Sequence, residues 1–159
     1  MVATDRIHSD TPENSRTPAP RGRAVILCVE RDPHVRDLER YFLEEAGFDV
    51  NFAEDGEQAL TLARALHPAI VITEILVPRL DGLALCRRLK AGADTCDIAV
   101  LVLSLLAAQG RAEDAGADAF LGKPLAARRL VETARALLGA ATGGPALLTA
   151  LVPESPRDR

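Results

Sequence analysis

The sequence has few aromatic residues, no tryptophan and no excess of basic charge. Aromatic side chains make up 3% of the 159 residues, so Ala, Leu and Val must supply most of the core. The formal net charge of −4 gives no electrostatic reason to expect binding to nucleic acid or to an anionic membrane surface. No apolar run reaches the length of a membrane span, and no basic segment followed by an apolar one has the pattern of a secretion signal. We therefore expect a cytoplasmic protein.

Cysteine is also scarce. The three cysteines, Cys28, Cys86 and Cys96, follow no zinc-binding spacing. An odd and unpatterned set is typical of reduced thiols in a cytoplasm. Cys28 lies within an apolar run, which favours a place in the core over a reactive role.

The chain is long enough for one domain, which we place at residues 24–139. A hydrophobic content of 48% suffices for a sizeable core. Residues 1–23 mix Thr, Ser, Pro and charged residues without periodicity, so they cannot bury enough apolar surface to offset the entropy of ordering. We predict a disordered tail there and a flexible tail over residues 140–159, where residues 145–152 could form one apolar turn or a docking peptide.

Apolar runs alternate with helical patterns along the domain. Runs without polar alternation are typical of strands buried on both faces of a parallel sheet, and they lie at residues 24–29, 48–53, 70–78, 98–104 and 117–121. Asp32 and Pro33 form a favourable N-cap and N1 pair for the first helix. Its predicted apolar face consists of Val35, Leu38, Phe42 and Ala46. Because parallel strands need right-handed crossovers, we predict the α/β class with a single doubly wound sheet of five strands.

Polar side chains occur where four of the five predicted strands end. They are Glu30 and Arg31 after the first strand, Glu74 in the third, Ser104 in the fourth and Lys123 after the fifth. The carboxyl ends of parallel strands share one edge of the sheet, where open α/β sheets bind ligands. We therefore expect these five side chains to meet in one crevice.

These segments resemble a bacterial response-regulator receiver domain over roughly residues 24–139. The resemblance rests on the segments LCVERDP, IVITEILVPRLDG, VLVLS and AGADAFLGKP. It implies a flavodoxin-like (βα)5 fold with strand order 2-1-3-4-5 and a cis peptide bond before Pro124. In that family a third-strand Asp accepts a phosphoryl group from a histidine kinase and two acidic residues after the first strand hold Mg²⁺. The resemblance also implies that Ser104 and Lys123 bind phosphoryl oxygens and that Phe120 is the aromatic switch residue.

Two residues depart from the family pattern. Glu74 stands at the position of the phospho-accepting Asp, and its carboxylate lies one methylene further from the backbone. A displacement of about 1 Å costs on the order of a hundredfold in positioned chemistry. Arg31 stands where the second acidic Mg²⁺ ligand is expected, and a guanidinium offers the metal no oxygen. We expect Mg²⁺ binding at the degenerate site of Glu30, Arg31 and Glu74 to be weak or absent, and we expect no other cofactor.

The resulting hypothesis is a pseudo-receiver that is not an enzyme and signals through contact with another protein. Glu74 would supply a permanent negative charge, paired with Arg31 and Lys123 in place of the metal. Each residue also has a simpler interpretation: Arg31 could point to solvent, Ser104 could only cap a helix, and Phe120 could be plain core. Two other functions stay open: a conventional phosphorelay receiver that tolerates Glu, and a small α/β phosphohydrolase with a carboxylate nucleophile.

The predicted output surface is small. The segment between Ser104 and Gly116 leaves room only for a short fourth helix, about one turn shorter than in typical receivers. Little apolar area remains on that face, so we expect a monomer or a weak dimer. No DNA-binding or kinase segment follows Leu138, and the expected partner is a histidine kinase, a scaffold or a downstream effector.

Overall fold

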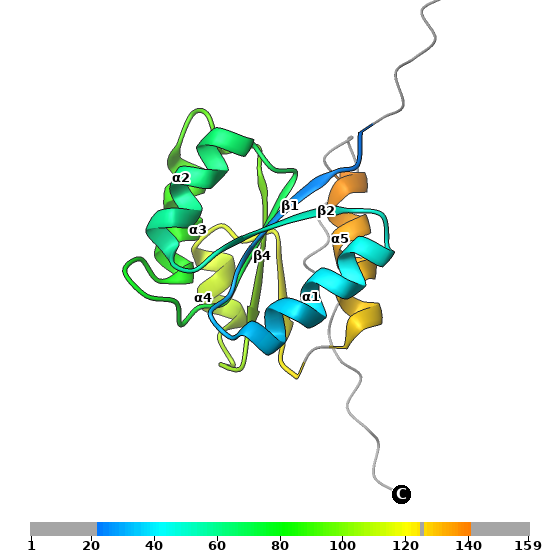
Figure 1. Ribbon diagram of the computed structural model, residues 1–159. Coiled ribbons are helices and arrows are strands. Elements are labelled where there is room, and N and C mark those ends of the chain that lie inside the picture. Colours follow the sequence, from blue (N-terminus) through cyan, green and yellow to red (C-terminus); the bar gives the residue numbers. More distant parts are fainter. Residues whose placement is uncertain (1–21, 125, 141–159) are drawn as a thin grey trace, which may run out of the picture.

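The domain is built on a five-stranded parallel sheet. The computed structural model describes residues 22–124 and 126–140, and its strands lie in the order β2-β1-β3-β4-β5 (Figure 1). Their bounds are β1 Val25–Val29, β2 Asp49–Ala53, β3 Ile70–Thr73, β4 Ala99–Ser104 and β5 Ala119–Gly122. The register aligns the ends of β1 and β3, because Thr73 pairs with Val29, whereas β4 continues past Val102, the partner of Thr73, to Ser104. The predicted α/β fold and strand order are confirmed.

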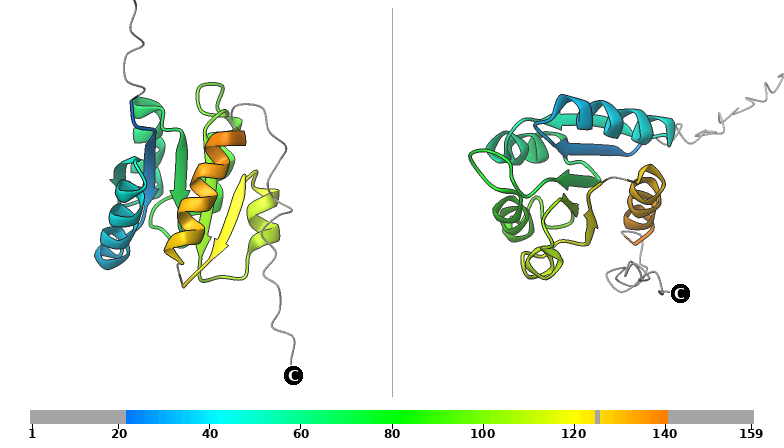
Figure 2. Two further views of the ribbon diagram at one scale, coloured as in Figure 1. Left: turned by 90° about the vertical axis from the view of Figure 1, so that its right-hand side faces the viewer. Right: turned by 90° about the horizontal axis from the view of Figure 1, so that it is seen from below.

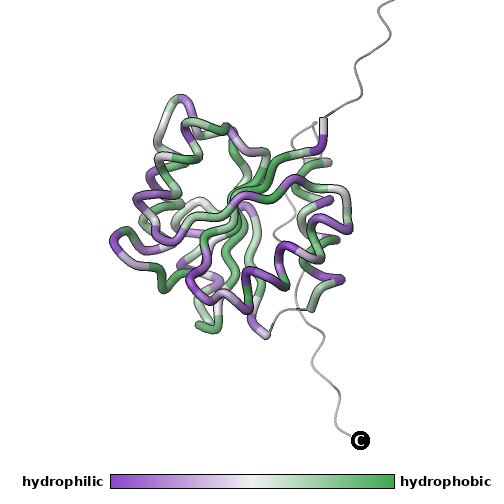
Figure 3. Tube along the Cα trace, viewed as in Figure 1, coloured by the Kyte–Doolittle hydropathy of each residue, from purple (hydrophilic) through white to green (hydrophobic). Residues whose placement is uncertain are grey.

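Five helices cover the two faces of the sheet. They are α1 Pro33–Glu45, α2 Gly56–Leu66, α3 Gly82–Ala91, α4 Gln109–Asp114 and α5 Ala127–Ala140. Figure 2 shows α1 and α5 on one face, with α2, α3 and α4 on the other. Each face has its own core: residues of α2, α3 and α4 pack on one, and residues of α1 and α5 pack on the other. The hydropathy colouring of Figure 3 places the apolar strands between these layers.

Aspartate side chains start three of the helices. Asp32, Asp55 and Asp81 each accept backbone N–H groups of the first helical turn, as N-cap residues do. All three caps lie in loops that follow strands, so the helices begin at the same edge of the sheet as the strand ends. The predicted N-cap at Asp32 and N1 proline at Pro33 are both confirmed.

The predicted apolar face of α1 is wrong in one position. Leu38 is 50% exposed, whereas the neighbouring Glu39 is only 2% exposed. The buried stripe of α1 runs through Glu39 and Leu43, which lie four residues apart on one face of the helix. An ionisable side chain therefore occupies a core position beneath β1.

The third strand is shorter than the apolar run predicts. It ends at Thr73, and the chain then turns, with the N–H groups of Val77 and Gly82 donating to the Ile75 carbonyl at 3.0 and 2.9 Å. Gly82 permits this turn, because a Cβ at that position would lie 2.1 Å from the Glu74 carbonyl oxygen. Glu74 is consequently the first residue of a loop at the carboxyl edge of the sheet.

Two further expectations concern the second half of the domain. The fourth helix is short, as predicted, with six residues, and the Lys123–Pro124 peptide bond is cis. The two predicted tails lie outside the described residues except at their inner ends. Within the part of the chain that is described, no helix is both long and apolar enough to cross a bilayer.

Candidate functional site

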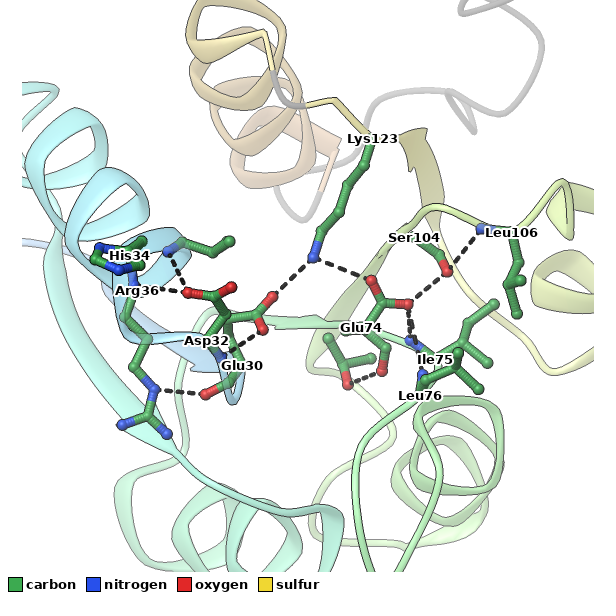
Figure 4. A network of polar contacts seen from close by, with 12 residues as sticks. Glu30, Asp32, His34, Arg36, Glu74, Ile75, Leu76, Ser104, Leu106 and Lys123 are labelled. Carbon is green, nitrogen blue, oxygen red and sulfur yellow. Dashed lines mark hydrogen bonds and ion pairs between the residues drawn. The ribbon is translucent and has the colours of Figure 1, made fainter.

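Four of the five predicted side chains meet at the carboxyl edge of the sheet. Glu30 follows β1, Glu74 follows β3, Ser104 ends β4 and Lys123 follows β5. Figure 4 shows their polar atoms converging from these four segments. The parallel sheet causes this convergence, because all its strands run in one direction and end side by side.

Lys123 bridges the two carboxylates of the cluster. Its Nζ lies 2.8 Å from Glu30 Oε2 and 3.0 Å from Glu74 Oε2. The three side chains are between 7% and 13% exposed. Burial by itself lowers the pKa of Lys123, but hydrogen bonds and charge attraction to Glu30 and Glu74 outweigh it and raise the pKa above its ordinary value. The ammonium group is thus a fixed cation between two fixed anions.

The second carboxylate oxygen of Glu74 accepts hydrogen bonds from its own loop and from the end of β4. Glu74 Oε1 accepts the backbone N–H of Ile75 at 2.7 Å and the hydroxyl of Ser104. Ser104 Oγ in turn accepts the N–H of Leu106 at 3.2 Å (Figure 4). One carboxylate therefore ties the loop after β3 to the loop after β4.

Glu30 organises the start of α1. Its Oε1 accepts the N–H of Asp32 at 2.9 Å, and its backbone carbonyl accepts Nε–H of Arg36. Arg36 also lies over the Phe52 ring, at 5.9 Å from the centroid, and its side chain is 22% exposed. Arg36 was not among the predicted site residues, and its only signal in the sequence is its position four residues after the Asp32 N-cap.

Arg31 does not pair with Glu74, contrary to the sequence-based hypothesis. Its side chain is exposed, and no ion pair joins it to Glu74 among residues 22–124 and 126–140. Successive side chains of an extended segment point to opposite sides. Because the Glu30 side chain points into the cluster, the side chain of Arg31, the next residue, points away from it. Arg31 instead lines an open cavity of about 590 Å³ outside the carboxylate cluster.

Phe120 lies on β5, where it pairs with Val102 of β4. It is half-buried against the core formed by α2, α3 and α4. This position accommodates both interpretations of Phe120, as a core residue and as a switch, and its role stays a prediction.

The carboxylate oxygens of Glu30 and Glu74 all have protein donors. Lys123 donates to one oxygen of each carboxylate, and the Asp32 N–H donates to the other oxygen of Glu30. The other oxygen of Glu74 accepts from the N–H groups of Ile75 and Leu76 and from the Ser104 hydroxyl. Mg²⁺ demands several oxygen ligands in near-octahedral geometry, and within the described residues no group of three or more His, Cys, Asp or Glu is arranged to hold a metal ion. In this arrangement Glu30 and Glu74 offer Mg²⁺ no carboxylate oxygen that is free of a protein donor.

Glu39 is a second buried acid that the sequence analysis missed. Burial and, secondarily, repulsion from Glu30 raise its pKa from 4.5 to about 8. Its Oε2 has no hydrogen-bond partner in the described part of the chain. The only sequence signal was its four-residue spacing from Leu43.

Comparison with known proteins shows the family. The family model for the response regulator receiver domain matches residues 26–135. The chain is 38% identical over 116 residues to the DNA-binding dual master transcriptional regulator RpaA of Synechocystis sp., and 40% identical over 116 residues to the response regulator MprA of Mycolicibacterium vanbaalenii. Each match covers 71% of this chain and 48% and 49% of the relative, so the chain spans about half the length of these proteins.

Solved structures give the same result. A putative response regulator from Chloroflexus aurantiacus superposes with a TM-score of 0.71 at 29% identity, over 74% of this chain and 98% of that one. The signal receiver domain of a histidine kinase from Syntrophus aciditrophicus also gives a TM-score of 0.71, at 30% identity, over 80% of this chain and 98% of that one. With the strand order and the site at the carboxyl edge, these matches show that the chain belongs to the response regulator receiver domain family of two-component signalling.

Proposed function

We propose that this receiver domain signals through protein contact without being phosphorylated at the usual position. Glu74 occupies the place of the phospho-accepting Asp and provides a permanent anion. The observation that carries the proposal is that Lys123, Ser104 and the N–H groups of Ile75 and Leu76 all donate to this carboxylate. A carboxylate held by four donors is poorly placed to attack a phosphoryl group.

The proposal includes independence from Mg²⁺. In phosphoryl transfer, a metal neutralises charge that develops on the transferred group. Here Lys123 already forms ion pairs with the two acids that would bind the metal, and Arg31 offers no ligand oxygen. The cation of the site would thus be a lysine side chain, which is present at all times.

Receiver domains act through contacts with histidine kinases and effectors, and the loops around Glu74 suit such a contact. Leu76, Leu105 and Leu106 are all exposed apolar side chains on the loops after β3 and β4. Glu74 holds both loops, directly through Ile75 and indirectly through Ser104 and Leu106. We propose that the fixed carboxylate keeps these apolar side chains in one arrangement for a protein partner.

Replacing Glu74 by Ala should loosen both loops. The N–H of Ile75 loses its acceptor, and Ser104 loses the partner that orients its hydroxyl toward Leu106. A hydrogen bond to a charged group contributes about 1.5–3 kcal/mol, so we expect amide exchange at Ile75 to accelerate about tenfold to a hundredfold. Leu106 donates to the neutral Ser104 hydroxyl, so its exchange should accelerate less. Hydrogen exchange read by NMR checks this. The control is Glu54→Ala, because Glu54 is exposed and lies 3.7 Å from Arg36 without touching these loops; equal exchange in both variants contradicts the role of Glu74.

Phosphorylation tests the proposal itself. We expect wild-type protein incubated with acetyl phosphate and Mg²⁺ to show no added phosphoryl mass at Glu74. Glu74→Asp alone should also remain unmodified, because Arg31 still replaces a metal ligand, whereas Glu74→Asp combined with Arg31→Asp should gain an acid-stable, base-labile adduct. Intact-mass spectrometry with peptide mapping is the readout.

Each opposite result has a definite meaning. A stable acyl phosphate on Glu74 in wild type would identify a conventional phosphorelay receiver. Full phosphorylation of the Glu74→Asp single variant would show that Arg31 does not hinder the metal. Metal-dependent turnover of a phosphate ester would favour the phosphohydrolase.

A further inference from the structure

A cavity lies beside the carboxylate cluster, and the residues that line it have no role in the proposed function apart from Arg31. It encloses about 590 Å³ and is lined by Arg31, Pro33, Arg36, Glu54, Asp55, Pro78 and Arg79. These residues come from the loops after β1, β2 and β3 and from the first turn of α1. The volume lies in the range of about 300–1,000 Å³ that small-molecule sites occupy. Glu30 and Glu74 do not line it.

Three guanidinium groups face two carboxylates across this cavity. Arg36 NH1 lies 3.7 Å from Glu54 Oε1, and Arg79 Nε lies 3.5 Å from Asp55 Oδ2. Both separations exceed the distance of a good hydrogen bond, about 2.7–3.2 Å, so these donors are not saturated. Arg31 has no hydrogen-bond or ion-pair partner within residues 22–124 and 126–140. The wall therefore carries one more positive charge than negative charge and several free N–H donors.

Arg36 is held in position before any ligand arrives. Its Nε–H is bound to the Glu30 carbonyl and its guanidinium packs over Phe52. Figure 4 shows the two terminal nitrogens pointing away from Glu30. A fixed guanidinium loses little entropy on binding, which is the advantage of preorganised sites.

Two helices begin at the cavity. Pro33 is the first residue of α1 and Asp55 is the N-cap of α2, and the carboxylates of Asp32 and Asp55 cap these N-termini, so the arginines supply the positive charge of the wall. Arg79 adopts φ of 67°, a left-handed conformation that costs energy in a residue other than glycine. Such outliers cluster at ligand sites.

We propose that this cavity binds a small molecule that carries two or three linked phosphoryl groups. Guanidinium groups bind phosphate oxygens in pairs, with two parallel hydrogen bonds. Arg31 and Arg79 lie on the loops after β1 and β3 and Arg36 lies on α1, so a chain of phosphoryl groups offers oxygens to all three arginines. Pro33 and Pro78 supply the apolar wall that a nucleoside group would need.

Titration of the full chain with four probes in metal-free buffer tests this site. We expect saturable binding of pyrophosphate and ADP by calorimetry, much weaker binding of orthophosphate, and no binding of adenosine. ADP binding tighter than pyrophosphate assigns a nucleotide, and equal affinities assign the polyphosphate group alone; either result supports the site. Absence of saturable pyrophosphate and ADP binding overturns it, as does orthophosphate binding with the affinity of pyrophosphate.

Variants locate the binding on the protein. Arg31→Ala should weaken pyrophosphate binding about tenfold, since one charge-assisted interaction is lost. This exposed residue has no partner to lose, so its replacement should leave the melting temperature unchanged. The control is Arg64→Ala on α2, where the side chain is also half-exposed and faces Asp94 at 3.9 Å, away from the cavity. Equal affinities in the two variants would place the anion elsewhere and overturn the proposal, while the acetyl phosphate result at Glu74 would stand independently.

Discussion

Glu39→Met should stabilise the protein by about 3 kcal/mol at pH 7. The carboxyl is 2% exposed on the inner face of α1, and its Oε2 has no hydrogen-bond partner in the described part of the chain. Burial and repulsion from Glu30 raise its pKa from 4.5 to about 8, and each pKa unit corresponds to about 1.4 kcal/mol. Methionine has a similar length and a good helix propensity, and it leaves no polar atom to satisfy.

The direction of the pH dependence follows from the raised pKa. The folded state binds the Glu39 proton more tightly than the unfolded state. The contribution of Glu39 to the free energy of unfolding is therefore fully present below pH 4.5. As the pH rises from 4.5 to about 8, unfolding releases a proton and the free energy of unfolding falls. Glu39→Met removes this titration. Urea unfolding at a series of pH values should therefore show the difference between variant and wild type growing across this window.

Two variants separate this effect from others. Glu39→Gln abolishes the titration but buries an amide, so it should gain less stability than Glu39→Met. Glu45→Met introduces the same residue at an exposed position of α1 and should change the free energy of unfolding by no more than about 0.5 kcal/mol. If the difference in free energy of unfolding between Glu39→Met and wild type stayed constant from about pH 5 to about pH 8, the raised pKa of Glu39 would be contradicted, because the predicted change across this window comes from the titration of Glu39.

Lys123→Met should destabilise the protein by about 3–5 kcal/mol at neutral pH, the cost of leaving buried charges uncompensated. The change removes the ammonium group from between Glu30 and Glu74, whose side chains are almost fully buried. Two carboxylates that share a site cannot both stay ionised at low cost, so one takes up a proton. Adding Glu30→Gln should recover much of the loss. Thermal and urea unfolding measure both effects.

The control for this change is Lys90→Met. Lys90 Nζ pairs with Asp118 Oδ2 at 2.7 Å, but both side chains are more exposed, at 22% and 39%. Removing one partner of a solvent-accessible pair costs about 1 kcal/mol or less. Equal losses in the two lysine variants would show that burial of the Glu30–Lys123–Glu74 cluster adds nothing to its energy.

The positions of the site residues along the chain could be predicted, because a parallel sheet brings the ends of its strands together. Glu30, Ser104 and Lys123 each follow or end an apolar run, Glu74 lies within one, and the alternation of strands and helices predicted their common edge. Periodicity also predicted the number of elements, and the short segment between Ser104 and Gly116 predicted the short α4. These features depend on backbone direction, which an apolar pattern reports well.

Side-chain direction was harder to predict. Arg31 follows Glu30 by one residue, and in extended backbone that single step turns its side chain from the cluster to the cavity. Leu38 and Glu39 are neighbours on α1. A hydrophobicity pattern assigns Leu38 to the core, but the helix is rotated so that Glu39 faces the sheet and Leu38 faces solvent. The end of β3 at Thr73 depends on the close approach of Gly82 to the Glu74 carbonyl, a tertiary contact that no local pattern contains.

The hydrogen bonds of Glu74 to two loops have a consequence for the duration of a signal. A phosphoryl group on an aspartate is lost by hydrolysis, whereas the carboxylate that ties the loops after β3 and β4 is part of the polypeptide. Under the proposed function, no phosphatase can end the state that this charge maintains. The strength of the output would then follow the rates of synthesis and degradation of the protein and the supply of its partner.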